Sequence, residues 1–177
     1  SVIPNQELLD RNIRGKVVMV TGAGGSIGSE LCRQIIKLGI KKLILFEHSE
    51  LALYSVNKEL NELDKKIEVL PILGSVLNKD RLEYICKKFR VQTIYHAAAY
   101  KHVPMVELNN TEGVKNNIFG TLSCVQAAIS SKVETFVLIS TDKAVRPTNT
   151  MGATKRIAEL VLQGLTKSSS KTVFTMV

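Results

Sequence analysis

The stretch Val20-Thr21-Gly22-Ala23-Gly24-Gly25-Ser26-Ile27-Gly28 decides the fold of this chain. An apolar run typical of a strand precedes it, and a helical pattern follows it. Gly22 permits a tight turn, Gly25 lets a diphosphate approach the backbone, and Gly28 lets the helix pack closely on the sheet. The start of that helix also offers free N–H groups and the positive end of the helix dipole. The spacing therefore predicts a dinucleotide-binding turn, with contacts from Gly22, Gly25, Ser26, Ile27 and Gly28.

A single acidic residue supports this interpretation and bears on the choice of cofactor. Glu47 ends the second predicted strand, where a carboxylate can accept hydrogen bonds from the hydroxyls of the adenosine ribose. A carboxylate would repel a 2′-phosphate, and the segment 47–50 contains no Arg or Lys to neutralise one. We therefore expect NAD rather than NADP.

Short aliphatic runs alternate with helical patterns from Lys16 onward. Strands are predicted at 16–20, 42–46, 67–70, 93–97, 135–140 and 172–177, and helices at 26–38, 50–63, 79–90, 111–131 and 152–166. Nearly continuous apolar strands that alternate with helices indicate a parallel sheet covered on both faces. The predicted fold is thus α/β, a doubly wound parallel sheet of the NAD(P)-binding Rossmann type.

The domain organisation follows from the extent of this pattern. Residues 1–14 carry little regular pattern and are expected to be a lead-in or linker, followed by one Rossmann domain over residues 15–177. The sixth predicted strand runs to the last residue, so little of the chain is left for a substrate-binding lobe. We expect that lobe to be truncated and the chain to be a fragment of a longer protein.

Composition excludes several classes of protein. No apolar run approaches the roughly 20 residues that cross a bilayer, and no signal peptide is visible. The three cysteines are far apart, which suits neither a zinc site nor a disulfide framework and favours reduced, buried thiols in the cytoplasm. The net charge of +8 arises from scattered lysine pairs. It favours an anionic substrate or membrane surface, but no basic, aromatic-rich platform for nucleic acid appears.

A second group of polar residues follows the fourth and fifth predicted strands. Ala97, Ala98 and Ala99 are small enough for a cofactor to lie against the backbone, whereas His96 and His102 are more often structural. The fifth strand leads into Thr141-Asp142-Lys143, and Met151 and Lys155 then lie on one face of the next helix. Ligands bind at the carboxyl ends of parallel strands. A hydroxyl, a carboxylate and two lysines collected there provide the parts for proton transfer.

With these motifs, the chain resembles the extended short-chain dehydrogenases that act on nucleotide sugars, above all the UDP-N-acetylhexosamine 4,6-dehydratases of polysaccharide and glycan biosynthesis. The resemblance covers essentially the whole chain. It rests on the segments Thr21–Gly28, His96–Pro104, Asn117-x-x-Gly120-Thr121, Ser140–Lys143 and Thr150–Arg156.

The resemblance also implies roles for single residues. Thr141 and Lys155 match the Ser/Thr and the Lys of the family's catalytic set, and Asn117 joins the cofactor-binding residues. Met151 stands where the family usually has its catalytic Tyr, and a thioether cannot exchange a proton. The large, membrane-associated dehydratases look similar in carrying Met there. A second departure is Ser75, where relatives commonly place an Asp near the adenine.

The chemistry that the resemblance implies is a dehydration of UDP-N-acetylglucosamine. Carbon 4 is transiently oxidised by NAD, and water is eliminated across carbons 5 and 6 before the hydride returns to carbon 6. Lys143 would be the base at carbon 5, Asp142 the acid at the 6-hydroxyl, and Lys155 the ligand of the nicotinamide ribose. The acceptor of the carbon-4 hydroxyl proton stays open between Thr141, acting through water, and Asp142.

Two rival functions remain at this point. A nucleotide-sugar 4- or 5-epimerase shares the cofactor and the substrate class, and a non-catalytic NAD(P)-binding module would explain Met151. The resemblance further implies a homo-oligomer formed through helices 111–131 and 152–166. It also implies a cytoplasmic domain of an inner-membrane protein, attached only through a missing N-terminal segment.

Overall fold

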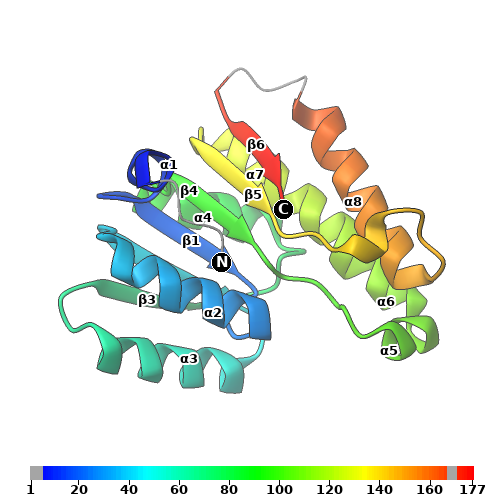
Figure 1. Cartoon of the computed structure of the whole chain (residues 1–177), viewed down its shortest axis with the longest axis horizontal. Helices are drawn as coiled ribbons and strands as arrows, with labels where there is room; N and C mark the ends of the chain where they lie inside the picture. The colour runs from blue at the N-terminus through cyan, green and yellow to red at the C-terminus, as the bar shows by residue number, and fades with distance from the viewer. Residues whose placement is uncertain (1–5, 167–170) are drawn as a thin grey trace.

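The computed structural model describes residues 6–166 and 171–177, which form one six-stranded parallel sheet with helices on both faces (Figure 1). The strands are β1 (Val17–Thr21), β2 (Lys42–Glu47), β3 (Glu68–Leu73), β4 (Thr93–His96), β5 (Thr135–Leu138) and β6 (Val173–Met176). Their order in the sheet is β3-β2-β1-β4-β5-β6. The predicted doubly wound parallel fold is confirmed.

The helices follow the strands in alternation. They are α1 (Gln6–Asn12), α2 (Ser26–Ile35), α3 (Glu50–Leu63), α4 (Lys79–Phe89), α5 (Val103–Leu108), α6 (Asn110–Val114), α7 (Gly120–Ser130) and α8 (Thr150–Thr166). Short 3-10 helices span Ile36–Leu38 and Asp142–Ala144, and a π-helical turn spans Lys115–Phe119. Capping residues bound several of these helices: Ser49 accepts from the backbone N–H of Ala52, Asn78 accepts from that of Arg81, and Gly39 has φ of +69°.

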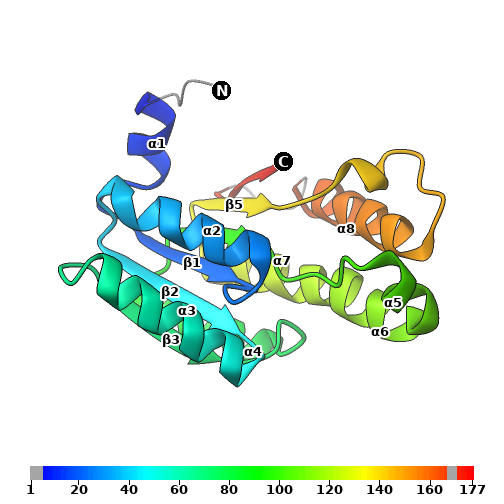
Figure 2. The same cartoon turned by 60° about the horizontal axis from the view of Figure 1, so that its bottom comes forward.

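The alternation of side chains along the strands divides the core into two layers. Val18 and Val20 of β1 pack with α2 and α3, which lie side by side on one face of the sheet (Figure 2). Val17 and Met19 point to the other face and pack with α4, α7 and α8. All three cysteines are buried and free, as expected, and burial raises the pKa of Cys32 to about 12.

Several boundaries differ from the sequence prediction. The expected lead-in contains α1, and Asn12 anchors it to the sheet by accepting a hydrogen bond from Thr93 Oγ1 at 2.7 Å. The third strand extends to Leu73 through Pro71, which is tolerated because β3 is an edge strand. The expected helix 111–131 is interrupted by the π-helical turn, and α5 was not predicted.

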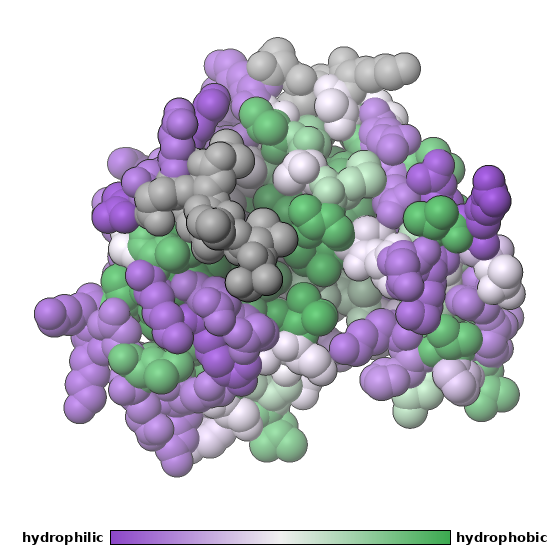
Figure 3. All heavy atoms as spheres, viewed as in Figure 1, coloured by the Kyte–Doolittle hydropathy of each residue, from purple (hydrophilic) through white to green (hydrophobic). Residues whose placement is uncertain are grey.

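The direction in which successive strands are added to the sheet reverses between β1 and β4. Chain connections leave β1 toward β2 and β3 on one side, and β4 leads to β5 and β6 on the other. The carboxyl ends of β1 and β4 therefore border a crevice that helices do not cover, which is the usual ligand position in such sheets. Figure 3, which has the view of Figure 1, shows apolar residues gathered near the centre of the view, with hydrophilic residues on both sides.

Two glycine substitutions compare the tightly packed glycine turn with an open position in α8. Gly28→Ala should destabilise the protein by about 1–3 kcal/mol, because the new Cβ would lie 2.0 Å from the Gly22 carbonyl oxygen. Gly164→Ala should stabilise it by about 0.5–1 kcal/mol, because this helical glycine has open space around it. Urea denaturation measures both changes, and a Gly28→Ala protein as stable as the wild type would contradict the packing argument.

Candidate active site

The glycine turn brings the backbone of three segments together at the end of β1. Gly22 has φ of +68°, and a Cβ on it would lie 2.6 Å from the Cα of Ala98. The carbonyl oxygen of Gly22 lies 2.0 Å from the Cβ position of Gly28 and leaves no room for a side chain there. The same oxygen accepts the backbone N–H of Gly25 at 3.0 Å. α2 then begins at Ser26, with its free N–H groups at the mouth of the crevice. The turn thus has the open backbone and helix start that phosphate binding requires, and phosphate binding by these residues stays a prediction.

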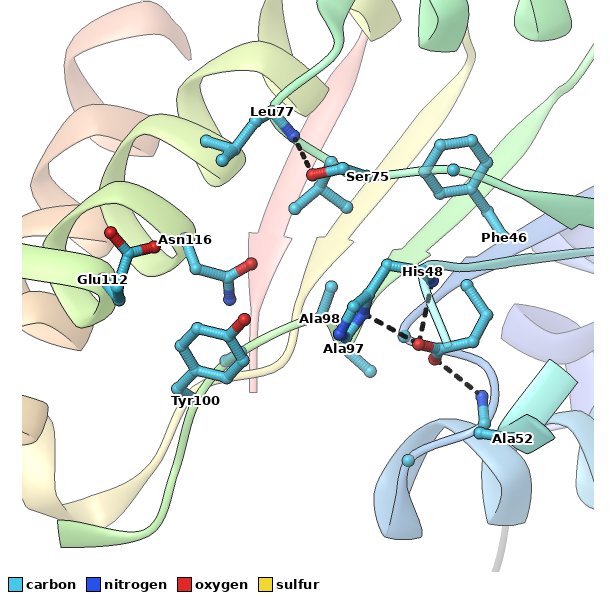
Figure 4. A pocket seen from close by; sticks show the side chains of 17 residues that line it. Phe46, His48, Ala52, Ser75, Leu77, Ala97, Ala98, Tyr100, Glu112 and Asn116 are labelled. Atoms are coloured by element: carbon cyan, nitrogen blue, oxygen red, sulfur yellow. Dashed lines mark hydrogen bonds and ion pairs between the residues drawn. The ribbon is translucent and has the colours of Figure 1, made fainter. Parts of the chain in front are cut away.

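A hollow of about 270 Å³ opens beside this turn (Figure 4). Phe46 and His48 lie on one side and Tyr100 and Asn116 on the other, with the small residues 97–98 between them. The lining residues are Gly22, Gly24, Gly25, Phe46, Glu47, His48, Ala52, Gly74, Ser75, Val76, Leu77, Ala97, Ala98, Ala99, Tyr100, Glu112 and Asn116. This first hollow has the size and the apolar walls that suit the adenosine half of a dinucleotide.

Glu47 lies in the wall of the first hollow and is 5% exposed. One carboxylate oxygen accepts the backbone N–H of Gly24 at 3.0 Å, and the other accepts those of His48 at 2.9 Å and Ser49 at 3.0 Å. The side chain therefore connects β2 to the glycine turn and still faces the hollow. Ser75 contributes a hydroxyl oxygen that accepts the Leu77 N–H at 3.2 Å.

A second hollow, of about 220 Å³, lies at the carboxyl end of β5. It shares Ala97 and Ala99 with the first. Its lining residues are Ile27, Ala97, Ala99, Lys101, Ile139, Ser140, Thr141, Lys143, Met151 and Lys155. The fold thus brings together four of the five predicted catalytic residues, which come from two separate segments, 141–143 and 151–155.

The fifth predicted catalytic residue, Asp142, lies at the edge of this site. Its side chain is 88% exposed and does not line the second hollow. Its carboxylate accepts hydrogen bonds from Thr141 Oγ1 at 3.0 Å and Lys143 Nζ at 3.4 Å. The Thr141 hydrogen bond and the Lys143 charge lower the pKa of Asp142.

Lys155 and Met151 form the floor of the second hollow. Lys155 is 6% exposed and its Nζ donates to the Ile139 carbonyl oxygen at 2.6 Å. Burial lowers the pKa of Lys155 to about 8, and the charge of Glu159 opposes that shift. Met151 is 2% exposed and lies one helical turn before Lys155, so a thioether occupies the position next to the amine.

Asn117 lies outside both hollows, in the π-helical turn, and is 1% exposed. Its Oδ1 accepts the Tyr100 N–H at 2.8 Å, and its Nδ2 donates to the Tyr100 carbonyl at 3.0 Å and to Thr154 Oγ1 at 2.9 Å. In this structure Asn117 therefore holds the segment after β4 against α8. Its neighbour Asn116 lines the first hollow instead.

A buried histidine links the same elements to β1. His96 Nδ1 lies 2.7 Å from Thr21 Oγ1, and its Nε2 lies 3.0 Å from Thr121 Oγ1. Thr121 donates its one hydroxyl proton to the Asn117 carbonyl at 2.7 Å, so toward His96 it can only accept. His96 therefore carries its proton on Nε2 and accepts at Nδ1 from Thr21. The chain of hydrogen bonds joins β1, β4 and the π-helical turn.

Sequence reasoning missed several residues that line the hollows. Phe46, Tyr100 and Lys101 are among them, and Lys101 also lines a third hollow of about 470 Å³ with Ser26 and α5. Tyr100 and Lys101 follow directly after the small residues at 97–99. Their position just after a predicted strand could have indicated that they lie near the site. It could not indicate whether their side chains point into a hollow.

Residues 6–166 and 171–177 contain neither a candidate metal site nor a candidate membrane span. No cluster of three or more His, Cys, Asp or Glu side chains there could hold a metal ion. No helix in those same ranges has the length and apolar character to cross a membrane. The homo-oligomer expected through the helices at 111–131 and 152–166 stays a prediction, and Phe119, Ile157 and Leu160 are large apolar side chains exposed there.

Comparison with known proteins now identifies the family. The model of a family described as "Polysaccharide biosynthesis protein" matches residues 18–177. The chain belongs to this polysaccharide biosynthesis family.

Curated relatives and a solved structure are similar to this chain. The capsular polysaccharide biosynthesis protein CapD of Staphylococcus aureus is 48% identical over 171 residues, which are 96% of this chain and 28% of CapD. An inverting UDP-N-acetylglucosamine 4,6-dehydratase of Campylobacter jejuni is 32% identical over 142 residues, 80% of this chain and 41% of that enzyme. The X-ray structure of Pen from Bacillus thuringiensis superposes with a TM-score of 0.83 and 34% identity, over 93% of this chain and 49% of Pen. This chain therefore spans less than half of each of these proteins.

The buried histidine generates a test of its own. Burial, and to a lesser degree the Lys155 charge, lowers the pKa of His96 to about 3. Between about pH 6.5 and 3 the unfolded histidine is protonated and the folded one is not, so stability is lost as the pH falls through this window. His96 should contribute a slope approaching about 1.4 kcal/mol per pH unit, which His96→Asn removes. Urea denaturation between pH 7 and 5 measures the slope, and equal slopes in both proteins would refute the assignment.

Proposed function

We propose that this chain is the NAD-binding and catalytic part of a nucleotide-sugar 4,6-dehydratase of polysaccharide biosynthesis, with UDP-N-acetylglucosamine as substrate. The observation that carries the proposal is the pair of adjoining hollows at the carboxyl ends of the strands. One lies on the glycine turn, and the other holds Thr141, Lys143, Met151 and Lys155. The similarity to the Campylobacter jejuni dehydratase supports the same reaction.

The residues present fit the dinucleotide. The floor that joins the two hollows is made of Ala97 and Ala99, and side chains larger than alanine would fill it. Gly25 lines the first hollow and has no side chain, so the backbone at the start of α2 is open to that hollow. The first N–H groups of α2 would hold the diphosphate, the residues of the first hollow the adenosine, and the residues of the second hollow the nicotinamide.

The chain's own residues account for the proton steps of the proposed reaction. When bound, the nicotinamide supplies reversible hydride acceptance at sugar carbon 4. Lys155, fixed to the Ile139 carbonyl, holds the nicotinamide ribose and stabilises negative charge that develops on the sugar oxygen. Lys143 takes the proton from carbon 5. Asp142 is an exposed carboxylate with a lowered pKa, so it first takes the proton of the carbon-4 hydroxyl as that carbon is oxidised. It then gives this proton to the departing 6-hydroxyl, which leaves as water. Lys143 returns its proton to carbon 5 once carbon 6 has been reduced.

A product assay tests the proposed function. The complete protein, given NAD and UDP-N-acetylglucosamine, should yield a nucleotide sugar lighter by one water, detected by mass spectrometry. Lys143→Ala should lower this turnover by at least about 100-fold, because a positioned base is lost, while NAD affinity stays within twofold. Lys58→Ala, an exposed lysine on α3, is the matched control. A product of unchanged mass would overturn the dehydratase in favour of an epimerase, and unchanged turnover in Lys143→Ala would remove Lys143 from the mechanism.

The first hollow also favours one form of the cofactor. Its walls carry the carboxylates of Glu47 and Glu112 and no Lys or Arg among the described residues that line it. A 2′-phosphate would meet the buried Glu47 charge, and the basic side chain beside it, His48, already lies with its Nδ1 2.9 Å from Glu47 Oε1.

We therefore expect NAD to bind at least about tenfold more tightly than NADP, which corresponds to about 1.4 kcal/mol. Fluorescence titration of the complete protein with NADH and NADPH measures the two dissociation constants. Equal constants would show that Glu47 does not discriminate between the two cofactors.

A further inference from the structure

Glu159 is a buried carboxylate that the proposed reaction does not use. It lies on α8 one turn after Lys155, and its side chain is 11% exposed. One oxygen accepts a hydrogen bond from Ser140 Oγ at 2.5 Å, and the other accepts one from Arg156 Nη1 at 2.8 Å. It lines neither of the two hollows proposed to hold the cofactor and the reacting sugar.

The two side chains of α8 contact adjacent residues at the end of β5. Lys155 donates to the carbonyl of Ile139, and Glu159 accepts from the hydroxyl of the next residue, Ser140. Ser140 lines the second hollow and directly precedes the segment Thr141–Lys143. One turn of α8 thus sets the position at which the polypeptide enters the catalytic segment.

The charges around Lys155 are mostly positive. Lys143 of the 3-10 helix and Lys101 of the segment after β4 line the same hollow, and His96 of β4 is neutral. On α8 itself Arg156 is directed to Glu159. Of the two nearby carboxylates, Asp142 is exposed to solvent and Glu159 is buried. Water screens a buried charge less than an exposed one. The Glu159 carboxylate therefore stabilises the Lys155 cation more strongly than the Asp142 carboxylate does.

We propose that Glu159 is a positioning residue of the active site, which holds Ser140 and the following Thr141–Lys143 segment against α8 and balances the charge of Lys155. The inference rests on the proposed function. It adds that the dehydratase depends on a carboxylate that touches neither cofactor nor substrate. Because burial lowers the pKa of Lys155 and the Glu159 charge raises it, loss of that charge should make Lys155 neutral at a lower pH.

Two substitutions separate the charge from the hydrogen bond. Glu159→Gln keeps the shape and an oxygen that can accept from Ser140, but it removes the charge. Ser140→Ala removes the hydrogen bond and keeps the charge. Glu83→Gln is the matched control, because Glu83 also pairs with a cation on its own helix, α4, and lies outside both hollows.

The first readout is the pH dependence of kcat/KM for dehydration by the complete protein. Activity needs the Lys155 cation, so it should fall as the pH rises through the pKa of Lys155. In Glu159→Gln this basic limb should move to lower pH by about one unit. Ser140→Ala should lower kcat severalfold and leave the limb in place, and Glu83→Gln should match the wild type.

The second readout is NMR titration of the lysine ε-methylene signals, with the Lys155 signal assigned by its loss in Lys155→Arg. The apparent pKa of Lys155 should be lower in Glu159→Gln than in the wild type. An unmoved Lys155 titration together with an unmoved basic limb would overturn the proposal, as would wild-type kcat in both Ser140→Ala and Glu159→Gln. A wild type that forms no dehydrated product would refute the proposed function alone, because the NMR titration still reports the effect of Glu159.

Discussion

The packing of α2 against the end of β1 is the constraint on which the rest of the molecule depends. The Cβ position of Gly28 lies 2.0 Å from the Gly22 oxygen, so the helix can approach only if residue 28 has no side chain. This approach aims the start of α2 at the crevice between β1 and β4. It also places Glu47 within hydrogen-bonding distance of the Gly24 N–H, so the end of β2 is held in the same unit.

A second, polar constraint joins this unit to the opposite side of the crevice. Thr21, His96 and Thr121 share hydrogen bonds in the interior, and Asn117 continues the contact to α8 through Thr154. Buried polar groups are costly unless they are fully paired, so this chain of bonds permits one relative placement of its members. The π-helical turn belongs to the same arrangement, because it turns the Asn117 amide toward Tyr100 and Thr154.

The catalytic half of the crevice depends on α8. Lys155 and Glu159 carry opposite charges one turn apart, and they contact consecutive residues at the end of β5. The sequence resemblance predicts a catalytic tyrosine at the position of Met151, whose thioether cannot exchange a proton. The reaction proposed for this site therefore relies on the segment after β5, with α8 as its support.

The sequence alone determined the fold class, the glycine turn and the strand ends that carry the site. These features are local: apolar periodicity, glycine spacing and the residues next to each strand end follow from short stretches of chain. It could not determine the helix at residues 6–12 or the exposure of the Asp142 side chain. Nor could it determine the hydrogen bonds from Asn117 to Thr154 and from Ser140 to Glu159. Each of these depends on contacts between residues distant in sequence, and on which way a side chain points. Only the tertiary structure decided them, because burial and partner geometry exist only once the sheet and its helices have packed.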